Sequence, residues 1–162
     1  MGHFGFSYVG LAYLLMLFIP NLIWTRRQPE DYGEASKHEN RFLHLLEQCG
    51  QVLVTCCALI FSDYNLSPCT WTPWGIWLAV SLLFMVLYEV CWIRYFRSRR
   101  TMQDMYRPFL GIPLPLATLP VAAFLLLGIY GRVIWMIAAA LLLGVGHIAI
   151  HWQHWRDSSA NM

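Results

Sequence analysis

Titratable and amide side chains recur inside the apolar segments of this 162-residue sequence. They are Asn21 in FIPN, Glu47 and Gln51 in HLLEQCGQ, Glu89 in LYEVCW, and His147 and His151 in GHIAIH. If these segments cross a bilayer, each ionisable group costs roughly 2.5–3.5 kcal/mol to insert. Such residues by default indicate a functional site rather than packing alone. The plain structural alternative is that Glu–His and Gln–Glu hydrogen bonds only hold helices together, at about 0.6 kcal/mol each.

These residue types support more than one chemistry. Carboxylates and imidazoles bind cations and polar solutes, and histidine exchanges protons near neutral pH. The H-x-x-x-H pair, His147 and His151, presents two nitrogens on one helical face. With Glu47 and Glu89 it makes four candidate ligands for zinc or iron. Because such histidine pairs also arise by chance, the pattern assigns no metal, and the cofactor and catalytic residues stay unknown.

The composition indicates the setting of these residues. The chain is 58% hydrophobic and 12% charged, whereas soluble domains have about 45–50% apolar and about 25% charged residues. Its apolar runs have the length of about 20 residues that a helix needs to cross a bilayer. They cover about 4–24, 43–63, 74–96, 109–130 and 132–153. The sequence therefore predicts an all-α, polytopic membrane protein: one bundle of five transmembrane helices over residues 1–162.

The basic residues predict the orientation. If the five spans alternate, ten of the eleven Lys and Arg residues fall on one side, and only Arg132 falls on the other. Lys and Arg in short loops stay in the cytoplasm. We therefore expect the N-terminus and Cys69 outside, the C-terminus inside, and a multi-pass protein of the plasma (inner) membrane. A net charge of +2 argues against a nucleic-acid partner.

This topology brings the polar groups to one depth, in the cytoplasmic half of the membrane. Ala140, Gly144, His147 and His151 follow spacings of one helical face, and small residues mark close helix contacts in membranes. Both imidazoles should therefore point into the bundle, where Glu47 and Glu89 would be their charge partners. His154, one turn further along, should lie among lipid headgroups.

Prolines mark the fourth span. Pro108 suits the first turn of a helix, where a missing N–H costs nothing. Pro113, Pro115 and Pro120 would lie inside the helix, where each frees a backbone carbonyl and bends the axis. We expect a broken or kinked segment, which either lines a cavity or only shapes the packing.

Several stretches together carry a family resemblance over nearly the whole chain. They are FIPNLIWTRRQPEDY, HENRFLHLLEQCGQVLV, LYEVCWIRYF, GIPLPLATLPVAAFLLLGIYG and GHIAIH. In these the chain resembles small, uncharacterised five-span membrane proteins of bacteria. The resemblance implies a membrane location and a five-span architecture, and it implies no activity.

We therefore expect an integral membrane protein with a cytoplasm-facing polar pocket, lined by the six residues named first, that binds or transports a small polar solute or ion. One alternative is a membrane-embedded enzyme that uses Glu and His as acid and base or as metal ligands. Another is a non-catalytic partner subunit or scaffold. The arginines of RYFRSRR with Arg107 offer a further site for an anionic lipid, and a homo-oligomer stays open.

Overall fold

A computed structural model of the chain describes residues 2–29, 32–33 and 40–160. This part is helical, with no strand and only two isolated bridges. The long helices are α1 (Tyr8–Trp24), α3 (Arg41–Ile60), α4 (Ile76–Phe96), α6 (Pro115–Tyr130) and α7 (Ile134–Ala160). Shorter elements connect them: the 3₁₀ turns η1 (Ser62–Tyr64), η2 (Pro68–Trp71) and η3 (Pro73–Gly75), and helix α5 (Met102–Tyr106).

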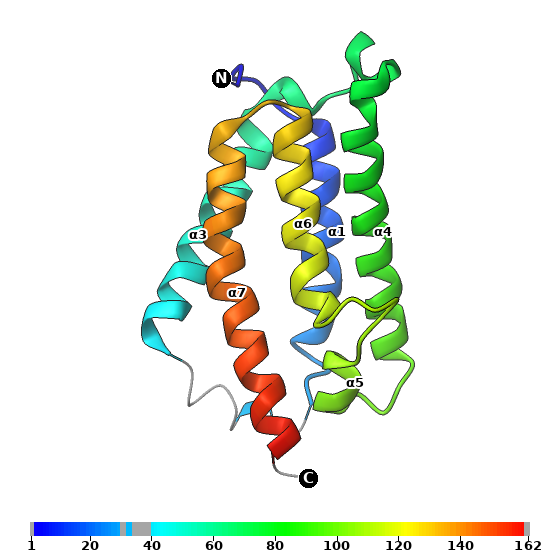
Figure 1. Ribbon diagram of the computed structural model, residues 1–162, viewed down its shortest axis with the longest axis vertical. Helices are drawn as coiled ribbons and strands as arrows, with labels where there is room; N and C mark the ends of the chain where they lie inside the picture. Colours follow the sequence, from blue (N-terminus) through cyan, green and yellow to red (C-terminus); the bar gives the residue numbers. More distant parts are fainter. Residues whose placement is uncertain (1, 30–31, 34–39, 161–162) are drawn as a thin grey trace.

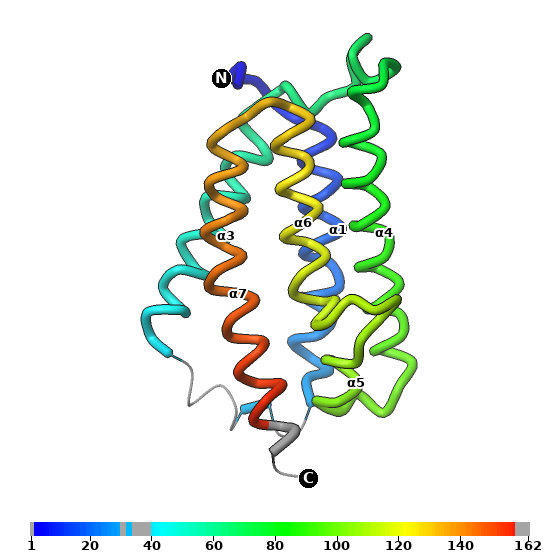
Figure 2. The backbone as a smooth tube through the Cα atoms, in the orientation of Figure 1, coloured from blue at the N-terminus to red at the C-terminus, as the bar shows by residue number. Residues whose placement is uncertain are grey.

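The long helices run along a common direction, with the two chain termini at opposite ends (Figure 1). Helix α7 packs against α3 on one side and α6 on the other, and α6 packs against α4. Helix α1 contacts both α3 and α4. The tube in Figure 2 places α5 and the loop before α6 near the C-terminal end, and the α6–α7 turn at the other end.

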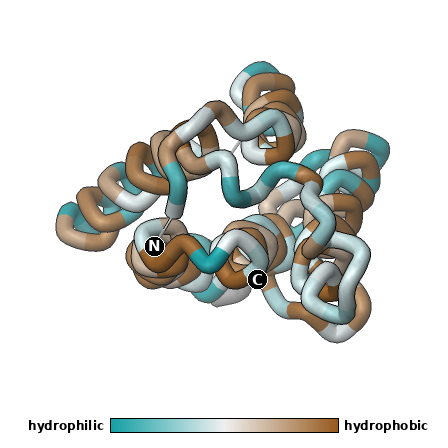
Figure 3. Tube along the Cα trace, turned by 90° about the horizontal axis from the view of Figure 1, so that it is seen from above, coloured by the Kyte–Doolittle hydropathy of each residue, from teal (hydrophilic) through white to brown (hydrophobic). Residues whose placement is uncertain are grey.

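The exposed surface of the helices is largely hydrophobic. About half or more of the side chain is exposed at Leu22, Val52, Leu83 and Leu141. In Figure 3, hydrophobic residues lie on the outer as well as the inner sides of the helices. In the described part, three helices are long and apolar enough to cross a membrane: Arg41–Ile60, Pro73–Phe96 and Ile134–Asp157. Helices α1 and α6 are apolar but shorter. The prediction of an all-helical protein is confirmed for the described residues, and the three long apolar helices fit a membrane protein.

The fourth predicted span is shorter than expected. Pro115 occupies the first turn of α6, where its missing N–H leaves no hydrogen bond unmade. Pro108 and Pro113 precede the helix, so the prediction that Pro108 opens it and Pro113 lies inside is wrong. A residue that precedes proline is disfavoured in the α conformation, which explains why no helix forms before Pro115. Only Pro120 lies inside α6.

Helix α5 begins with a reciprocal cap. The Thr101 hydroxyl accepts from the Asp104 N–H at 3.1 Å, and Thr101 N–H donates to the Asp104 carboxylate at 3.2 Å. Burial raises the pKa of Asp104, but hydrogen bonds from Thr101 and Ser98 outweigh it, so the pKa lies below its ordinary value. The cap fixes the start of a short helix that would be marginal alone.

Candidate ligand-binding site

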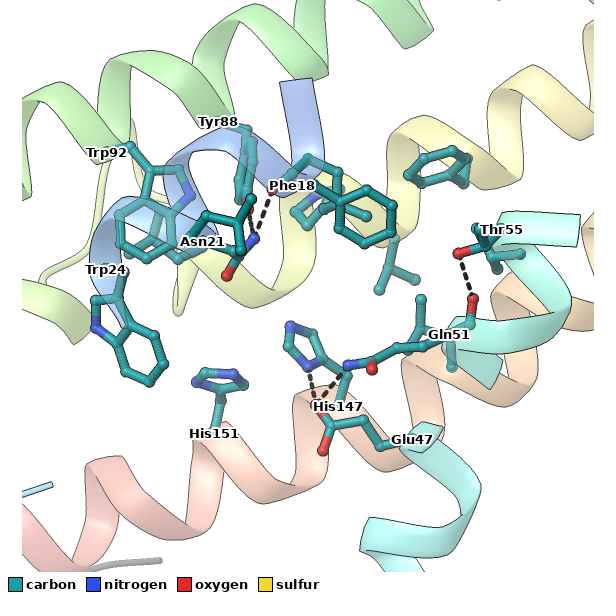
Figure 4. A pocket seen from close by; sticks show the side chains of 18 of the residues that line it. Phe18, Asn21, Trp24, Glu47, Gln51, Thr55, Tyr88, Trp92, His147 and His151 are labelled. Carbon is teal, nitrogen blue, oxygen red and sulfur yellow. Dashed lines mark hydrogen bonds and ion pairs between the residues drawn. The ribbon is translucent and has the colours of Figure 1, made fainter. Parts of the chain in front are cut away.

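A cavity of about 400 Å³ lies between the helices, toward the end of the bundle where the chain terminates. Side chains from α1, α3, α4, α5, α6 and α7 line it. Ligand pockets in proteins span about 300–1,000 Å³, so the volume suits a small molecule. Most lining residues are aromatic or aliphatic, and Glu47, Gln51, His147 and His151 gather on one wall (Figure 4).

The polar wall centres on a carboxylate–imidazole pair between α3 and α7. Glu47 Oε1 lies 2.5 Å from His147 Nδ1, and the side chains are 14% and 19% exposed. Gln51 Nε2 donates to the same oxygen at a longer distance, 3.4 Å. The predicted meeting of Glu47 with His147 is therefore observed, and Gln51 stands beside it.

His151 lies one turn further along α7 and also lines the cavity. Its ring centroid is 4.4 Å from that of His147, with the two planes at 72°. Its Nδ1 is buried and has no hydrogen-bond partner among the described residues. In Figure 4 the two imidazoles stand next to each other on the cavity wall, facing the aromatic side chains opposite.

Two glycines determine how closely α3 and α7 approach at this point. A Cβ on Gly146 would stand 2.6 Å from the backbone nitrogen of Glu47, and one on Gly50 would stand 2.5 Å from Leu143 Cα. Both distances are too short for any other residue, so the helices touch backbone to backbone here. That contact places Glu47 directly opposite His147.

Aromatic residues from α1 and α4 form the facing wall. Asn21 Nδ2 donates to the Leu17 carbonyl and to the Tyr88 hydroxyl, both at 2.7 Å. Trp24 and Trp92 stand beside this pair (Figure 4). Asn21 thus lines the cavity as predicted, with its amide nitrogen held by α1 and α4 rather than by the histidines.

Glu89 does not join the site. Its neighbour Tyr88 lines the cavity, and Glu89 does not. Successive residues on a helix point about 100° apart, and α4 turns Tyr88 and Trp92 toward the cavity. Glu89 Oε1 is buried without a hydrogen-bond partner among the described residues. The prediction that Glu89 is a charge partner of the histidines is wrong.

His154 also departs from its predicted place. Helix α7 continues to Ala160, and the His154 side chain is buried within the protein, 1% exposed, rather than among headgroups. Its Nδ1 lies 3.2 Å from the Tyr106 hydroxyl, and the Tyr106 ring also contacts the His151 ring, 5.6 Å between centroids. Helix α5 therefore packs against the end of the polar wall.

Arg94 holds the loop that precedes α6. Its guanidinium donates to the carbonyls of Pro108 at 3.1 Å and Arg107 at 2.5 Å, and it lies over the Phe109 ring at 5.2 Å. These contacts use two of its donors within the protein. Binding of an anionic lipid by the remaining arginines of this site, Arg97, Arg99, Arg100 and Arg107, stays a prediction.

The arrangement supports two kinds of chemistry. Glu47, His147 and His151 each offer one ligand atom, and these atoms all lie within 4.8 Å of one another, close enough to share a metal ion. The hydrogen-bonded Glu47–His147 pair also has the geometry of a general base with its orienting group.

Sequence reasoning missed three contributors to the site: Gly146, Tyr106 and the tryptophans of the facing wall. Gly146 carried a usable signal, because it precedes His147 directly and small residues mark helix contacts. The aromatic residues carried none, since tryptophan at helix ends is also typical of membrane interfaces. Comparison of the chain with models of protein families, with curated proteins and with solved structures gives no match.

Proposed function

We propose that this chain is a five-span protein of the plasma (inner) membrane, with its N-terminus outside and its C-terminus in the cytoplasm. Helices α1 and α6, with 17 and 16 residues, are about 25 Å long, so short non-helical segments complete their spans. The α5 end, next to the C-terminus, carries most described arginines, and Arg132 lies in the turn at the opposite end. Lys37, also assigned to the cytoplasm, lies outside the described residues. The charge distribution supports this orientation.

We propose that the cavity binds a small molecule with one polar end and an apolar body. The observation that carries this proposal is the division of the cavity into a Glu47–His147–His151 wall and an aromatic wall. Pockets with a few convergent polar groups in an apolar lining are the usual form of small-molecule sites. The polar end of the ligand would meet the carboxylate and imidazoles, and its body would meet Trp24 and Trp92.

The cavity lining also supports entry of the ligand from the bilayer. Phe18 and Leu22 of α1 line it and are 42% and 67% exposed, and Gln51 of α3 is exposed as well. The cavity therefore reaches the bundle surface between α1 and α3. A molecule dissolved in the membrane would reach the polar wall there without crossing a water-filled vestibule.

Packing at the opposite end favours binding over passage through one chain. Tyr13, Leu127 and Met136 are at most 2% exposed and fill the half of the bundle nearer the N-terminus. A solute held at Glu47 would have to pass these buried side chains to leave at the opposite end. Transport would require a rearrangement of the helices or an oligomer.

Mass spectrometry of co-purifying molecules tests the binding proposal. The chain would be purified in lipid nanodiscs beside Thr55→Trp, which fills the cavity from α3, and Val52→Trp, which places the same side chain on the exposed face of α3. The expected result is a species carried by the original chain and by Val52→Trp and at least tenfold depleted in Thr55→Trp. Equal profiles in all three samples would contradict the proposal.

A second candidate is a membrane-embedded enzyme, favoured by the short Glu47–His147 hydrogen bond inside the cavity. The His147 imidazole would exchange a proton with the bound molecule while Glu47 holds the ring in position. Under this reading the co-purified molecule accumulates in Glu47→Gln and is converted when the original chain is incubated with it. An unchanged molecule in both samples argues for a binding protein.

A further inference from the structure

We infer that Glu47, His147 and His151 form a mononuclear site for a divalent first-row transition metal inside the membrane. The three ligand atoms come from two helices that touch backbone to backbone, and they lie within 4.8 Å of one another. The inference rests on the proposed function, because it assigns a metal to the polar wall of the same cavity.

Small side-chain movements would bring the three atoms to a metal. Zinc binds histidine nitrogen and carboxylate oxygen at about 2.0–2.2 Å, so two ligands of a tetrahedral site stand about 3.3 Å apart. Glu47 Oε1 and His147 Nδ1 now share a proton at 2.5 Å. A metal would replace that proton, as metal binding to histidine sites generally does. The pair would open by less than about 1 Å, and His151 would turn inward.

His151 supplies the independent evidence for a missing ligand. Its Nδ1 is buried in the cavity wall and lacks a hydrogen-bond partner among the described residues. Leaving a buried polar group unpaired is costly, and native structures usually avoid it. A metal between the rings of His147 and His151 would satisfy this nitrogen. The ring contact of 4.4 Å already places the two imidazoles at one point.

The donor set indicates which metals would bind. Two imidazole nitrogens and one carboxylate oxygen suit zinc, iron(II) or cobalt(II), whereas calcium and magnesium prefer six or more oxygens. Gln51 would hold the carboxylate in place through its contact with Glu47 Oε1, the role that partners of metal ligands commonly play.

Three protein ligands leave at least one coordination position open, as in metal sites that bind water or substrate. That position would face the cavity and its aromatic wall. The polar end of the proposed ligand would then be a group that coordinates metals, such as a hydroxyl, carbonyl or carboxylate. The metal would also offset the negative charge of Glu47 in the low-dielectric interior.

Cobalt binding tests the inference directly. The chain would be purified without a histidine tag, stripped with chelator, checked for monodisperse elution and titrated with Co²⁺. The expected result is one tightly bound Co²⁺ with the visible absorption of a four- or five-coordinate site, displaced by one equivalent of Zn²⁺. Failure of the stripped chain to bind either ion would overturn the inference.

Single substitutions identify the ligands. Glu47→Gln, His147→Asn and His151→Asn should each weaken Co²⁺ binding by at least about tenfold. The matched control is Glu89→Gln, which removes another carboxyl group in a span, outside the cavity, and should bind Co²⁺ as the original chain does. Unchanged binding in the three site variants, or an equal loss in Glu89→Gln, would contradict the assignment. The conservative variants keep a polar side chain of similar size, and the elution profile identifies any that fails to fold.

The two proposals fail separately. A co-purified molecule that depends on Thr55, found in a chain that binds no metal, would overturn the metal site and leave the binding proposal standing. Stoichiometric Co²⁺ binding that is lost in Glu47→Gln, in a chain without any Thr55-dependent molecule, would overturn the binding proposal and leave the metal site standing.

Discussion

The substitution Gly146→Ala tests whether the backbone contact between α3 and α7 positions the polar wall. The added Cβ would stand 2.6 Å from the Glu47 backbone nitrogen and 2.7 Å from the Leu43 carbonyl oxygen. Ordinary contacts begin near 3.4 Å, so the helices must separate locally by about 0.8 Å. Backbone atoms cannot rotate aside as a flexible side chain does. Overpacking of this kind costs about 1–3 kcal/mol.

The same displacement acts on the site. Moving Glu47 by about 0.8 Å would stretch its 2.5 Å hydrogen bond with His147 to about 3.3 Å, past the outer limit of about 3.2 Å for such bonds. The metal-bound pair would itself stand about 3.3 Å apart, so the substitution should weaken the hydrogen bond of the metal-free pair and lower the stability of the chain while Co²⁺ binding is kept. The assays are Co²⁺ titration and thermal unfolding followed by size-exclusion chromatography, both in nanodiscs.

Gly144→Ala is the matched control on the same helix. Its Cβ would meet the Val121 side chain at 3.0 Å and the Ile148 side chain at 4.0 Å, and side chains can shift. Both substitutions gain the same intrinsic helix preference of about 0.8–1 kcal/mol, so their difference isolates the backbone clash. If Gly146→Ala unfolds at the same temperature as Gly144→Ala, the reasoning is refuted.

Three further predictions follow from other parts of the chain. Cys69 is exposed in η2, so a membrane-impermeant maleimide should label it on intact cells, and the signal should vanish in Cys69→Ser; labelling only after lysis would reverse the proposed orientation. Tyr106→Phe should lower stability by about 1–3 kcal/mol, because it removes a buried partner of His154, and an unchanged unfolding temperature would contradict this. The depressed pKa of Asp104 contributes stability that is present above the ordinary carboxyl pKa, about 3.9, and lost as the pH falls through the lower folded value; Asp104→Asn should flatten this acid dependence, and a profile identical to that of the original chain would exclude the carboxylate as its cause.

Sequence reasoning predicted the core of the site because two periodicities converge on it. Glu47 with Gln51, and His147 with His151, each follow a spacing of four residues, so each pair lies on one helical face. The alternation of spans then places both faces at one depth. Their observed contact needed only that these faces turn toward each other, which the cost of an ionisable group in lipid favours.

The departures have local causes that the pattern did not contain. Glu89 shares the predicted depth, but the side chains that α4 turns toward the cavity are Tyr88 and Trp92. The hydropathy pattern ends the last span at residue 153, whereas α7 continues to Ala160. His154 therefore lies within the helix, one turn beyond His151. Depth follows from sequence spacing and topology, whereas rotation about a helix axis depends on packing contacts such as the one at Gly146.

The start of α6 shows the same limit in the backbone. An apolar run of about 22 residues predicts a span from 109, yet the helix begins at Pro115. Hydropathy measures the length of an apolar segment, and proline determines where that segment is helical. The turn that Phe109 and Ile112 form before the helix belongs to the local chemistry of prolines and glycine rather than to the hydropathy pattern.

X-ray absorption spectroscopy of the zinc-loaded chain in nanodiscs tests the central claim most directly, because it reports the atoms bound to the metal. The site of Glu47, His147 and His151 predicts nitrogen and oxygen neighbours at about 2.0–2.2 Å with the multiple-scattering signal of two imidazoles. A sulfur neighbour at about 2.3 Å would instead place the metal at a cysteine such as the exposed Cys49 or Cys56. That spectrum, or one without imidazole, would contradict the account.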